Sequence, residues 1–261
     1  MANTSIVDAK KIKKLEIETL DRFTDSRNSF IPIDKNILGL LEKFESTPSE
    51  RLNSKEIDIK ILSNEDSQSL MCKVVLLGDA GVGKTSIQKR YVHQRFSEDY
   101  LVTIGTEIAL KYEKIGSHRI KFQIWDIAGH SQFHEVRKGY YSHVAGGVIV
   151  CDITKKETMT SLNDWIKELW TNNGKGPIPF ILVGNKIDLQ NPEVNLAVNK
   201  SLAKYIEAIS SRTLKSHGFR VHYIPASAKT GENIQDIFKK VGIQIIAYEN
   251  FLTEIKMKNT V

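Results

Sequence analysis

One short segment, GDAGVGKT at residues 78–85, has the residue types and the spacing that could hold a phosphate chain. It fits the pattern G-x-x-x-x-G-K-[ST], in which glycines let backbone N–H groups curl around phosphate oxygens. Lys84 could reach the β- and γ-phosphates of a nucleotide, and the hydroxyl of Thr85 could join a Mg²⁺ shell. The segment therefore predicts a nucleotide site, but it does not distinguish ATP from GTP, or a kinase from a switch.

A second motif, NKID at residues 185–188, could read the base of that nucleotide. The carboxylate of Asp188 can accept from both the N1–H and the 2-amino group of guanine, and adenine offers no such pair of donors. Lys186 can lay its stem along the base, while Asn185 can tie the loop together. A site that reads a base with buried polar groups discriminates strongly, because the wrong base leaves them unpaired. The motif favours guanine and disfavours a P-loop ATPase or kinase.

The elements that must position these motifs alternate between strand and helix. Apolar or alternating runs predict strands at 73–78, 119–127, 146–153, 180–184 and 222–228. Amphipathic runs predict helices at 83–96, 161–170, 194–215 and 233–252, the second with Ser161 as its N-cap. This order predicts an α/β chain with the three-layer P-loop NTPase fold, in which helices cover both faces of a mostly parallel sheet. Ligands bind such sheets at the carboxyl ends of the strands.

The chain is expected to divide into three parts. Residues 1–70 form a partly ordered N-terminal extension of unknown role, residues 71–252 form the nucleotide-binding domain, and residues 253–261 form a C-terminal tail. Within the extension, ILGLLEKF at 37–44 has helical spacing and KEIDIKIL at 55–62 alternates as a strand does.

Composition argues against several classes of protein. The formal charge of +6 is modest and no dense Lys/Arg patch is interleaved with aromatics, so nucleic acid is not an expected partner. The cluster KKIKK at 10–14 is typical of a solvated helix face, with contact to a membrane surface or a partner as the less favoured alternative. No apolar run is long enough to span a bilayer. Cys72 and Cys151 lie beside apolar runs and are expected to be buried free thiols.

With both motifs in place, the chain resembles a Ras-superfamily small GTPase and is most similar to the Rab branch. The resemblance covers roughly residues 71–251. It is carried by KVVLLGDAGVGKTSIQKRYVHQRFSEDYLVTIGTEI (73–108), by WDIAGHSQFHEVRKGYYSHVAGGVIVCDIT (125–154), and by the short motifs NKID and SAK. It implies a guanine-nucleotide-dependent molecular switch that binds GTP or GDP with Mg²⁺ and hydrolyses GTP slowly.

The resemblance also implies a set of site residues. The nucleotide would be bound by Asp79, Ala80, Gly81, Val82, Gly83, Lys84, Thr85, Ser86, Phe96, Tyr100, Thr103, Gly129, Asn185, Lys186, Asp188, Ser227, Ala228 and Lys229. Mg²⁺ would be held by Thr85, Thr103 and, through water, Asp126. Catalysis would involve Lys84, Thr103, Gly129 and His130. Phe96 would pack edge-on against guanine, and the Ala228 N–H would meet the base carbonyl.

Two loops are expected to report the state of the nucleotide. They are the first switch, residues 96–108, and the second switch, residues 127–143. Thr103 and Gly129 could both contact a γ-phosphate only when GTP is bound, so loss of that phosphate would release both loops. The resemblance implies effectors, an exchange factor and an activating protein that bind these loops.

The exposed aromatics that partners of Rab proteins read are only partly present. Trp125 and Tyr140 match two of those positions, but Ile108 stands where a Rab protein usually has phenylalanine. We expect a monomeric cytoplasmic protein.

The main departure from the family pattern is His130, which replaces the glutamine that orients the attacking water in Ras and Rab proteins. Histidine can also donate to and accept from a water molecule, and translational GTPases with histidine at this place hydrolyse GTP when stimulated. Arg95 and Arg137 are near the switches, but neither is an obvious arginine finger. Two hypotheses stay open: a slow GTPase, and a GTP-loaded binding or scaffold module with negligible hydrolysis.

Three further departures concern shape and anchoring. Ala80 replaces a common glycine, and its methyl group could crowd an incoming arginine. The tail EIKMKNTV holds no cysteine for a prenyl group, so membrane contact is expected to be at most peripheral, through a partner or the N-terminal part of the chain. The 39 positions from Asp188 to Ser227 exceed the usual spacing, and we interpret the extra segment as an extended helix in a tolerated surface insertion.

Overall fold

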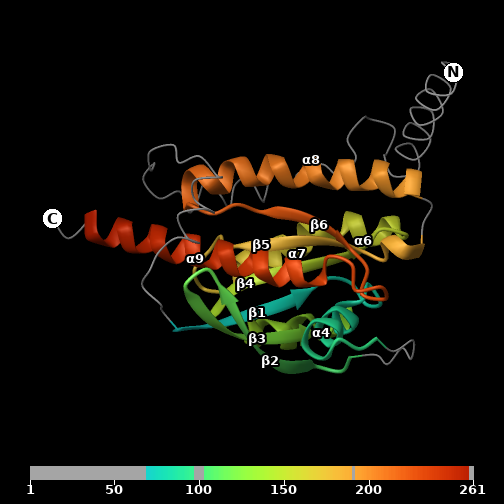
Figure 1. Cartoon of the computed structure of the whole chain (residues 1–261), viewed down its shortest axis with the longest axis horizontal. Helices are drawn as coiled ribbons and strands as arrows, with labels where there is room; N and C mark the ends of the chain where they lie inside the picture. Colours follow the sequence, from blue (N-terminus) through green and yellow to red (C-terminus); the bar gives the residue numbers. More distant parts are fainter. Residues whose placement is uncertain (1–68, 97–102, 190–191, 259–261) are drawn as a thin grey trace, which may run out of the picture.

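The computed structural model describes residues 69–96, 103–189 and 192–258 (Figure 1). The predictions for residues 10–14, 37–44 and 55–62 lie outside the described residues.

One six-stranded sheet, ordered β2-β3-β1-β4-β5-β6, forms the centre of the described chain. Its strands are β1 (Ser69–Leu77), β2 (Thr106–Ile115), β3 (His118–Ile127), β4 (Val144–Asp152), β5 (Phe180–Asn185) and β6 (His222–Ala226). β2 pairs with β3 in antiparallel register, and every other neighbouring pair is parallel. The predicted mostly parallel sheet is confirmed, and the carboxyl ends of its parallel strands meet at one edge.

Helices cover both faces of this sheet (Figure 1). On one face lie α4 (Lys84–His93) and α9 (Ile234–Lys258), and on the other lie α6 (Lys156–Thr160), α7 (Leu162–Asn172) and α8 (Pro192–His217). Short helical turns complete the connections: η1 (Ser131–Phe133), α5 (His134–Lys138), η2 (Gly139–Tyr141) and η3 (Ile187–Leu189). Side chains alternate along a strand. Val74 and Leu76 of β1 therefore pack on the face covered by α4 and α9, while Val75 and Leu77 pack on the face covered by α6, α7 and α8.

Two glycines in β4 let helices approach the sheet closely from both sides. A Cβ at Gly147 would lie 2.7 Å from Cδ2 of Leu169 on α7, and a Cβ at Gly146 would lie 3.0 Å from Cδ1 of Ile245 on α9. Both separations are tighter than ordinary side-chain contacts, so an alanine at either position would have to displace the helix side chain that packs there. The pair GG in GGVIVCDI therefore allows close packing of both helices at the middle of the sheet.

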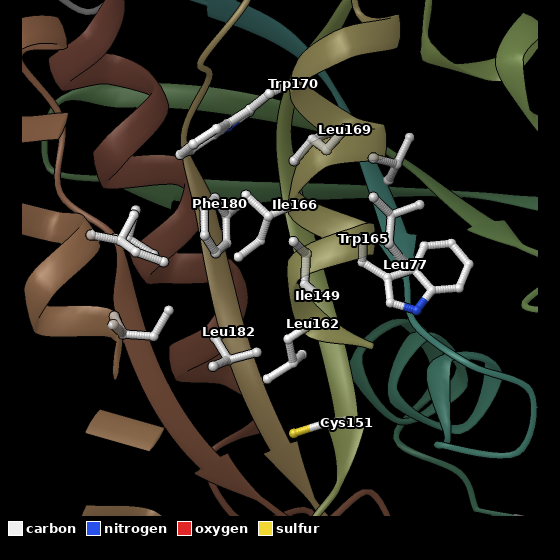
Figure 2. Packing of buried hydrophobic residues seen from close by; sticks show 14 of the residues in the cluster. Leu77, Ile149, Cys151, Leu162, Trp165, Ile166, Leu169, Trp170, Phe180 and Leu182 are labelled. Carbon is white, nitrogen blue, oxygen red and sulfur yellow. The ribbon is translucent and has the colours of Figure 1, made fainter. Parts of the chain in front are cut away.

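The core beneath α7 is built from large side chains (Figure 2). Trp170 is fully buried, donates from Nε1 to the carbonyl oxygen of Ile178 at 3.0 Å, and lies 5.8 Å from Phe180 between ring centroids. Cys151 lies in the same cluster and Cys72 in the cluster on the opposite face, and both are free thiols, as predicted. Burial raises the pKa of the Cys72 thiol to about 11, which makes it unreactive at neutral pH.

The long helix α8 is part of the core rather than an addition to the surface. The helix itself was predicted and is confirmed. Its inner face carries buried side chains that join the cluster beneath α7: Val198, Leu202, Tyr205, Ile206 and Ile209. The interpretation of this segment as a surface insertion is wrong for that face, because removing it would expose the apolar side of the cluster.

Two boundaries differ from the sequence-based expectation. Ser161 does occupy the N-cap position of α7, but its hydroxyl makes no capping bond and donates instead to Oδ2 of Asp79 at 2.7 Å. α9 continues to Lys258, past the expected end at residue 252. Within the described residues, no helix is both long and apolar enough to cross a membrane.

Truncation of Trp170 should lower the free energy of unfolding far more than truncation of an exposed side chain does. Trp170→Ala removes a fully buried indole and leaves the Ile178 carbonyl without its donor, so we expect a loss of about 3–5 kcal/mol in the free energy of unfolding. Urea denaturation followed by circular dichroism measures it. Met257→Ala, at a side chain that is 66% exposed, is the control and should change stability by less than about 0.5 kcal/mol. A loss below about 1 kcal/mol for Trp170→Ala would contradict the packing described.

Candidate nucleotide site

A cavity of about 550 Å³ opens at the carboxyl edge of the sheet, within the size range of small-molecule sites. Predicted site residues that line it are Ala80, Gly81, Gly83, Lys84, Thr85, Ser86, Phe96, Thr103, Gly129, His130, Asn185, Lys186, Asp188, Ala228 and Lys229. The phosphate motif, the base-reading motif and both switches therefore contribute to a single cavity. Tyr100 lies outside the described residues.

The loop between β1 and α4 is shaped by glycines at positions where a side chain cannot fit. Gly78, Gly81 and Gly83 have φ values of 134°, 76° and 102°, in the region that favours glycine. A Cβ at Gly78 would lie 2.1 Å from the carbonyl oxygen of Val150, and a Cβ at Gly83 would lie 2.2 Å from Nδ2 of Asn185. The loop thus brings its backbone to the first turn of α4, whose N-terminal N–H groups favour an anion.

Lys84 places a positive charge inside this loop. Its Nζ donates to the carbonyl oxygens of Gly78 at 2.7 Å and Asp79 at 2.8 Å, and the side chain is only 6% exposed. Burial lowers the pKa of Lys84 to about 8, although the charges of Asp126 and Asp79 act in the opposite direction. A buried cation with only carbonyl partners is a suitable binding group for the anionic oxygens of a phosphate.

Three oxygen-bearing side chains meet beside Lys84. Thr85 Oγ1 donates to Oδ2 of Asp126 at 2.5 Å and lies 3.0 Å from Oγ1 of Thr103. Asp126 is fully buried, and its Oδ1 has no hydrogen-bond partner among the described residues. Burial raises the pKa of Asp126, against the hydrogen bond from Thr85 and the charge of Lys84. Hydroxyl and carboxylate oxygens suit Mg²⁺, so these residues fit the metal that the sequence predicted.

The base-reading corner is held by side chains from three loops. Asn185, 1% exposed, donates from Nδ2 to the carbonyl oxygen of Val82 at 2.8 Å and accepts from the Ala228 N–H at 3.1 Å. Oδ1 of Asp188 accepts from Oγ of Ser227 at 2.6 Å, which fixes the carboxylate that faces the cavity. The Ala228 N–H, expected on the base carbonyl, is thus engaged by Asn185 in this structure.

Gly129 and His130 bring the second switch against the phosphate loop. A Cβ at Gly129 would lie 2.4 Å from the carbonyl oxygen of Gly78 and 2.6 Å from Nζ of Lys84, so only glycine fits there. His130 follows, partly exposed, and lines the cavity. Its imidazole has no hydrogen bond to the part of the chain that the structure describes, and it is free to bind water or a ligand.

Comparison with known proteins assigns this arrangement to a family. The Ras family model matches residues 73–247. The chain belongs to the Ras family.

Its relatives are Rab-like. Human Ras-related protein Rab-31 is 39% identical over 174 residues, which cover 66% of this chain and 82% of the relative. Ras-related protein SEC4 of Saccharomyces cerevisiae is 30% identical over 175 residues, which cover 67% and 75%. Ras-related protein Rab-18-B of Danio rerio is 32% identical over 182 residues, which cover 70% and 82%. The predicted Rab-like Ras-superfamily membership is confirmed.

Several predicted site residues of this Ras-family chain do not line the cavity. Asp126, Ser227 and Val82 are buried, and the first two act on residues that do line it. The carboxylate of Asp79 accepts from Nε1 of Trp165 at 2.8 Å and from Ser161, so it faces α7 rather than a ligand. Only the backbone of Asp79 and Val82 is available to the site.

Sequence reasoning missed two side chains that support the predicted site residues, Asp152 and Arg90. Asp152 pairs through Oδ2 with Nζ of the predicted residue Lys186 at 2.7 Å, and the same Nζ donates to the Gly81 carbonyl oxygen at 2.8 Å. Arg90 of α4 donates from Nε to the Ala228 carbonyl at 2.9 Å. The sequence could have predicted Asp152, because it is the last residue of an apolar strand and ligands bind at the carboxyl ends of such strands. Arg90 gave no such signal, because its contact spans 138 positions of the sequence.

The outer face of the sheet beside the switches carries the aromatics that the sequence singled out. Trp125 and Tyr140 lie 6.0 Å apart between ring centroids, and Nζ of Lys73 lies 3.7 Å from the centroid of Trp125. Ile108, opposite Trp125 in the register of β2 and β3, is 51% exposed. Of these three side chains Ile108 is exposed, while Trp125 and Tyr140 are partly buried.

Asp188→Asn should weaken the binding of GDP while leaving the fold intact. An amide cannot accept from both guanine donors, so we expect an affinity loss of roughly a hundredfold or more. Titration of nucleotide-free protein with fluorescent GDP measures it, and Asp164→Asn, at an exposed carboxylate on α7, is the control. Equal affinities for Asp188→Asn and the parent chain would refute the assignment of the base-reading residue.

Proposed function

We propose that this chain is a Rab-like guanine-nucleotide switch that binds GTP and GDP with Mg²⁺ and hydrolyses GTP slowly. The observation that carries the proposal is the shared cavity, which is lined by both Lys84 of the phosphate motif and Asp188 of the base-reading motif. Such a cavity selects a ligand that has both a phosphate chain and a guanine base. The Ras-family membership supports the same conclusion, since Ras-family GTPases bind guanine nucleotides.

Each group has a role that follows from its position. Lys84 and the first turn of α4 would neutralise phosphate charge. Thr85, Thr103 and Asp126 would hold Mg²⁺, which supplies further positive charge to the phosphates. The Gly129 N–H would donate to a γ-phosphate, because Gly129 lies directly against the phosphate loop and Lys84.

Switching would follow from the contacts of Thr103 and Gly129. Both residues line the cavity and belong to different loops, which are joined beside it by the hydrogen bond from the Ala128 N–H to the Gly105 carbonyl oxygen at 2.9 Å. A γ-phosphate would add a link between Thr103 and Gly129 themselves, and its loss would remove that link. Effectors and regulators would then bind residues 96–108 and 127–143 according to the nucleotide. We propose a monomeric cytoplasmic protein whose membrane contact, if any, is peripheral and made through a partner.

Hydrolysis would depend on His130 and would be slow without a partner. His130 lines the cavity and can orient a water molecule through a ring nitrogen. No arginine from the described residues lines the cavity, so a guanidinium that stabilises the transition-state charge would come from a partner or from outside the described residues. The same observation supports the second candidate, a GTP-loaded scaffold whose bound nucleotide persists.

Single-turnover hydrolysis of bound GTP distinguishes the two candidates. For the GTPase, His130→Ala should lower the rate constant at least about tenfold, because the group that orients water is lost, while His93→Ala, at an exposed histidine on α4, should not. The proposed hydrolysis fails if the parent chain holds GTP unchanged and His130→Gln turns it over; the scaffold function would then be the correct one.

Removal of Mg²⁺ from the proposed ligands Thr85, Thr103 and Asp126 should accelerate release of the nucleotide. Excess EDTA should speed dissociation of fluorescent GDP at least about tenfold, since the phosphates lose charge compensation. Thr85→Ala should already release GDP quickly in Mg²⁺ and gain little from EDTA. Thr230→Ala, at an exposed threonine, serves as the control and should respond as the parent does. An unchanged EDTA response in Thr85→Ala would contradict the proposed metal site.

A further inference from the structure

A buried guanidinium connects the second switch to α7. Arg137 lies on α5 and is only 4% exposed. It forms a two-pronged ion pair with Glu168 of α7, with Nε 2.8 Å from Oε1 and Nη2 3.0 Å from Oε2. Glu168 also accepts from Oη of Tyr141 at 2.7 Å and lies 3.2 Å from Nδ1 of His134. The Glu168 carboxylate, itself held by Tyr141 and His134, thus fixes the guanidinium plane, and the guanidinium does not line the cavity as an arginine finger would.

The remaining nitrogen of this guanidinium holds the loop that carries His130. Nη1 donates to the carbonyl oxygen of His130 at 2.7 Å and, at 3.3 Å, to that of Ala128. The Ala128 carbonyl precedes Gly129 and the His130 carbonyl follows His130, so Arg137 holds the backbone at both ends of the Gly129-His130 pair, whose glycine contacts the phosphate loop. The restraint acts on backbone carbonyls, from a residue that does not line the cavity, and leaves the His130 imidazole unengaged.

The ring of Trp165 links the same guanidinium to the phosphate loop. The Arg137 guanidinium carbon lies 4.7 Å from the ring centroid of Trp165, and the indole Nε1 donates to Oδ1 of Asp79 at 2.8 Å. The carbonyl of Asp79 in turn accepts from Nζ of Lys84 at 2.8 Å. One helix, α7, therefore anchors both the phosphate loop and the loop that carries His130.

We propose that Arg137 is a positioning residue, which holds residues 128–130 so that His130 faces the place of the γ-phosphate. The inference deepens the proposed function and rests on it for its kinetic consequence. Lysine cannot replace arginine here, because a single ammonium group cannot serve Glu168 and the two backbone carbonyls in one plane. Small displacements of an aligned group lower rates steeply, by up to about a hundredfold per ångström.

Kinetics of Arg137→Lys test the proposal. The rate constant for single-turnover hydrolysis should fall about ten- to hundredfold, while the affinity for GDP changes less than about threefold. Lys138→Met is the matched control on the same helix, since the Lys138 ammonium is exposed and pairs with the exposed Glu135. If Arg137 acts through His130, the double variant Arg137→Lys/His130→Ala should be no slower than His130→Ala alone. A further loss in the double variant would overturn the proposal.

Amide hydrogen exchange separates this inference from the proposed GTPase activity. In the GDP-bound protein, Arg137→Lys should raise exchange at residues 128–133 at least about tenfold, with no change in β4 or β5. If the lysine variant fails to fold, Glu168→Gln can replace it. This change keeps the shape of the side chain but removes its charge, and it should raise exchange at the same residues. Unchanged exchange in the variant that folds would overturn the positioning role. If the parent chain does not hydrolyse GTP, the proposed activity fails, and the exchange result alone decides whether Arg137 holds the loop.

Discussion

The buried ammonium group of Lys84 is the constraint on which the rest of the site depends. A cation taken out of water is costly unless anionic or strongly polar groups surround it. Here it has two backbone carbonyls, with the carboxylates of Asp126 and Asp79 near enough to offset part of the cost of burial. A phosphate chain would complete the charge balance. The glycines of the loop, the N-terminus of α4 and the strand ends are arranged around that requirement.

The three layers of the fold convert this local requirement into a connected site. Gly147 lets α7 approach the sheet, and α7 then presents Trp165 to the phosphate loop and Glu168 to the second switch. The opposite face supports the loop after β6, the proposed base site, because Arg90 of α4 donates to the Ala228 carbonyl oxygen there. Elements far apart in sequence thus share the task of holding a small set of backbone groups at fixed positions.

Local patterns in the sequence predicted most of the fold and the residues that line the cavity. Apolar runs located five of the six described strands, and the motifs GDAGVGKT and NKID located the two ends of the site. β2 was not predicted on its own, because it is an edge strand whose side chains Ile108, Leu110 and Tyr112 are half or more exposed. The role of Arg137 could not be predicted either. Its partner Glu168 is 31 positions away, and nothing local marks a charge pair that forms only after α7 has packed.

The nucleotide content of the purified chain tests the central claim most directly, namely that this cavity holds a guanine nucleotide. The protein would be purified in Mg²⁺ without added nucleotide, denatured, and its released ligand separated by chromatography and quantified. The account predicts close to one guanine nucleotide per chain, because Lys84 and Asp188 select both ends of the ligand. Adenine nucleotide in its place, or an emptied protein that binds ADP as tightly as GDP, would contradict it.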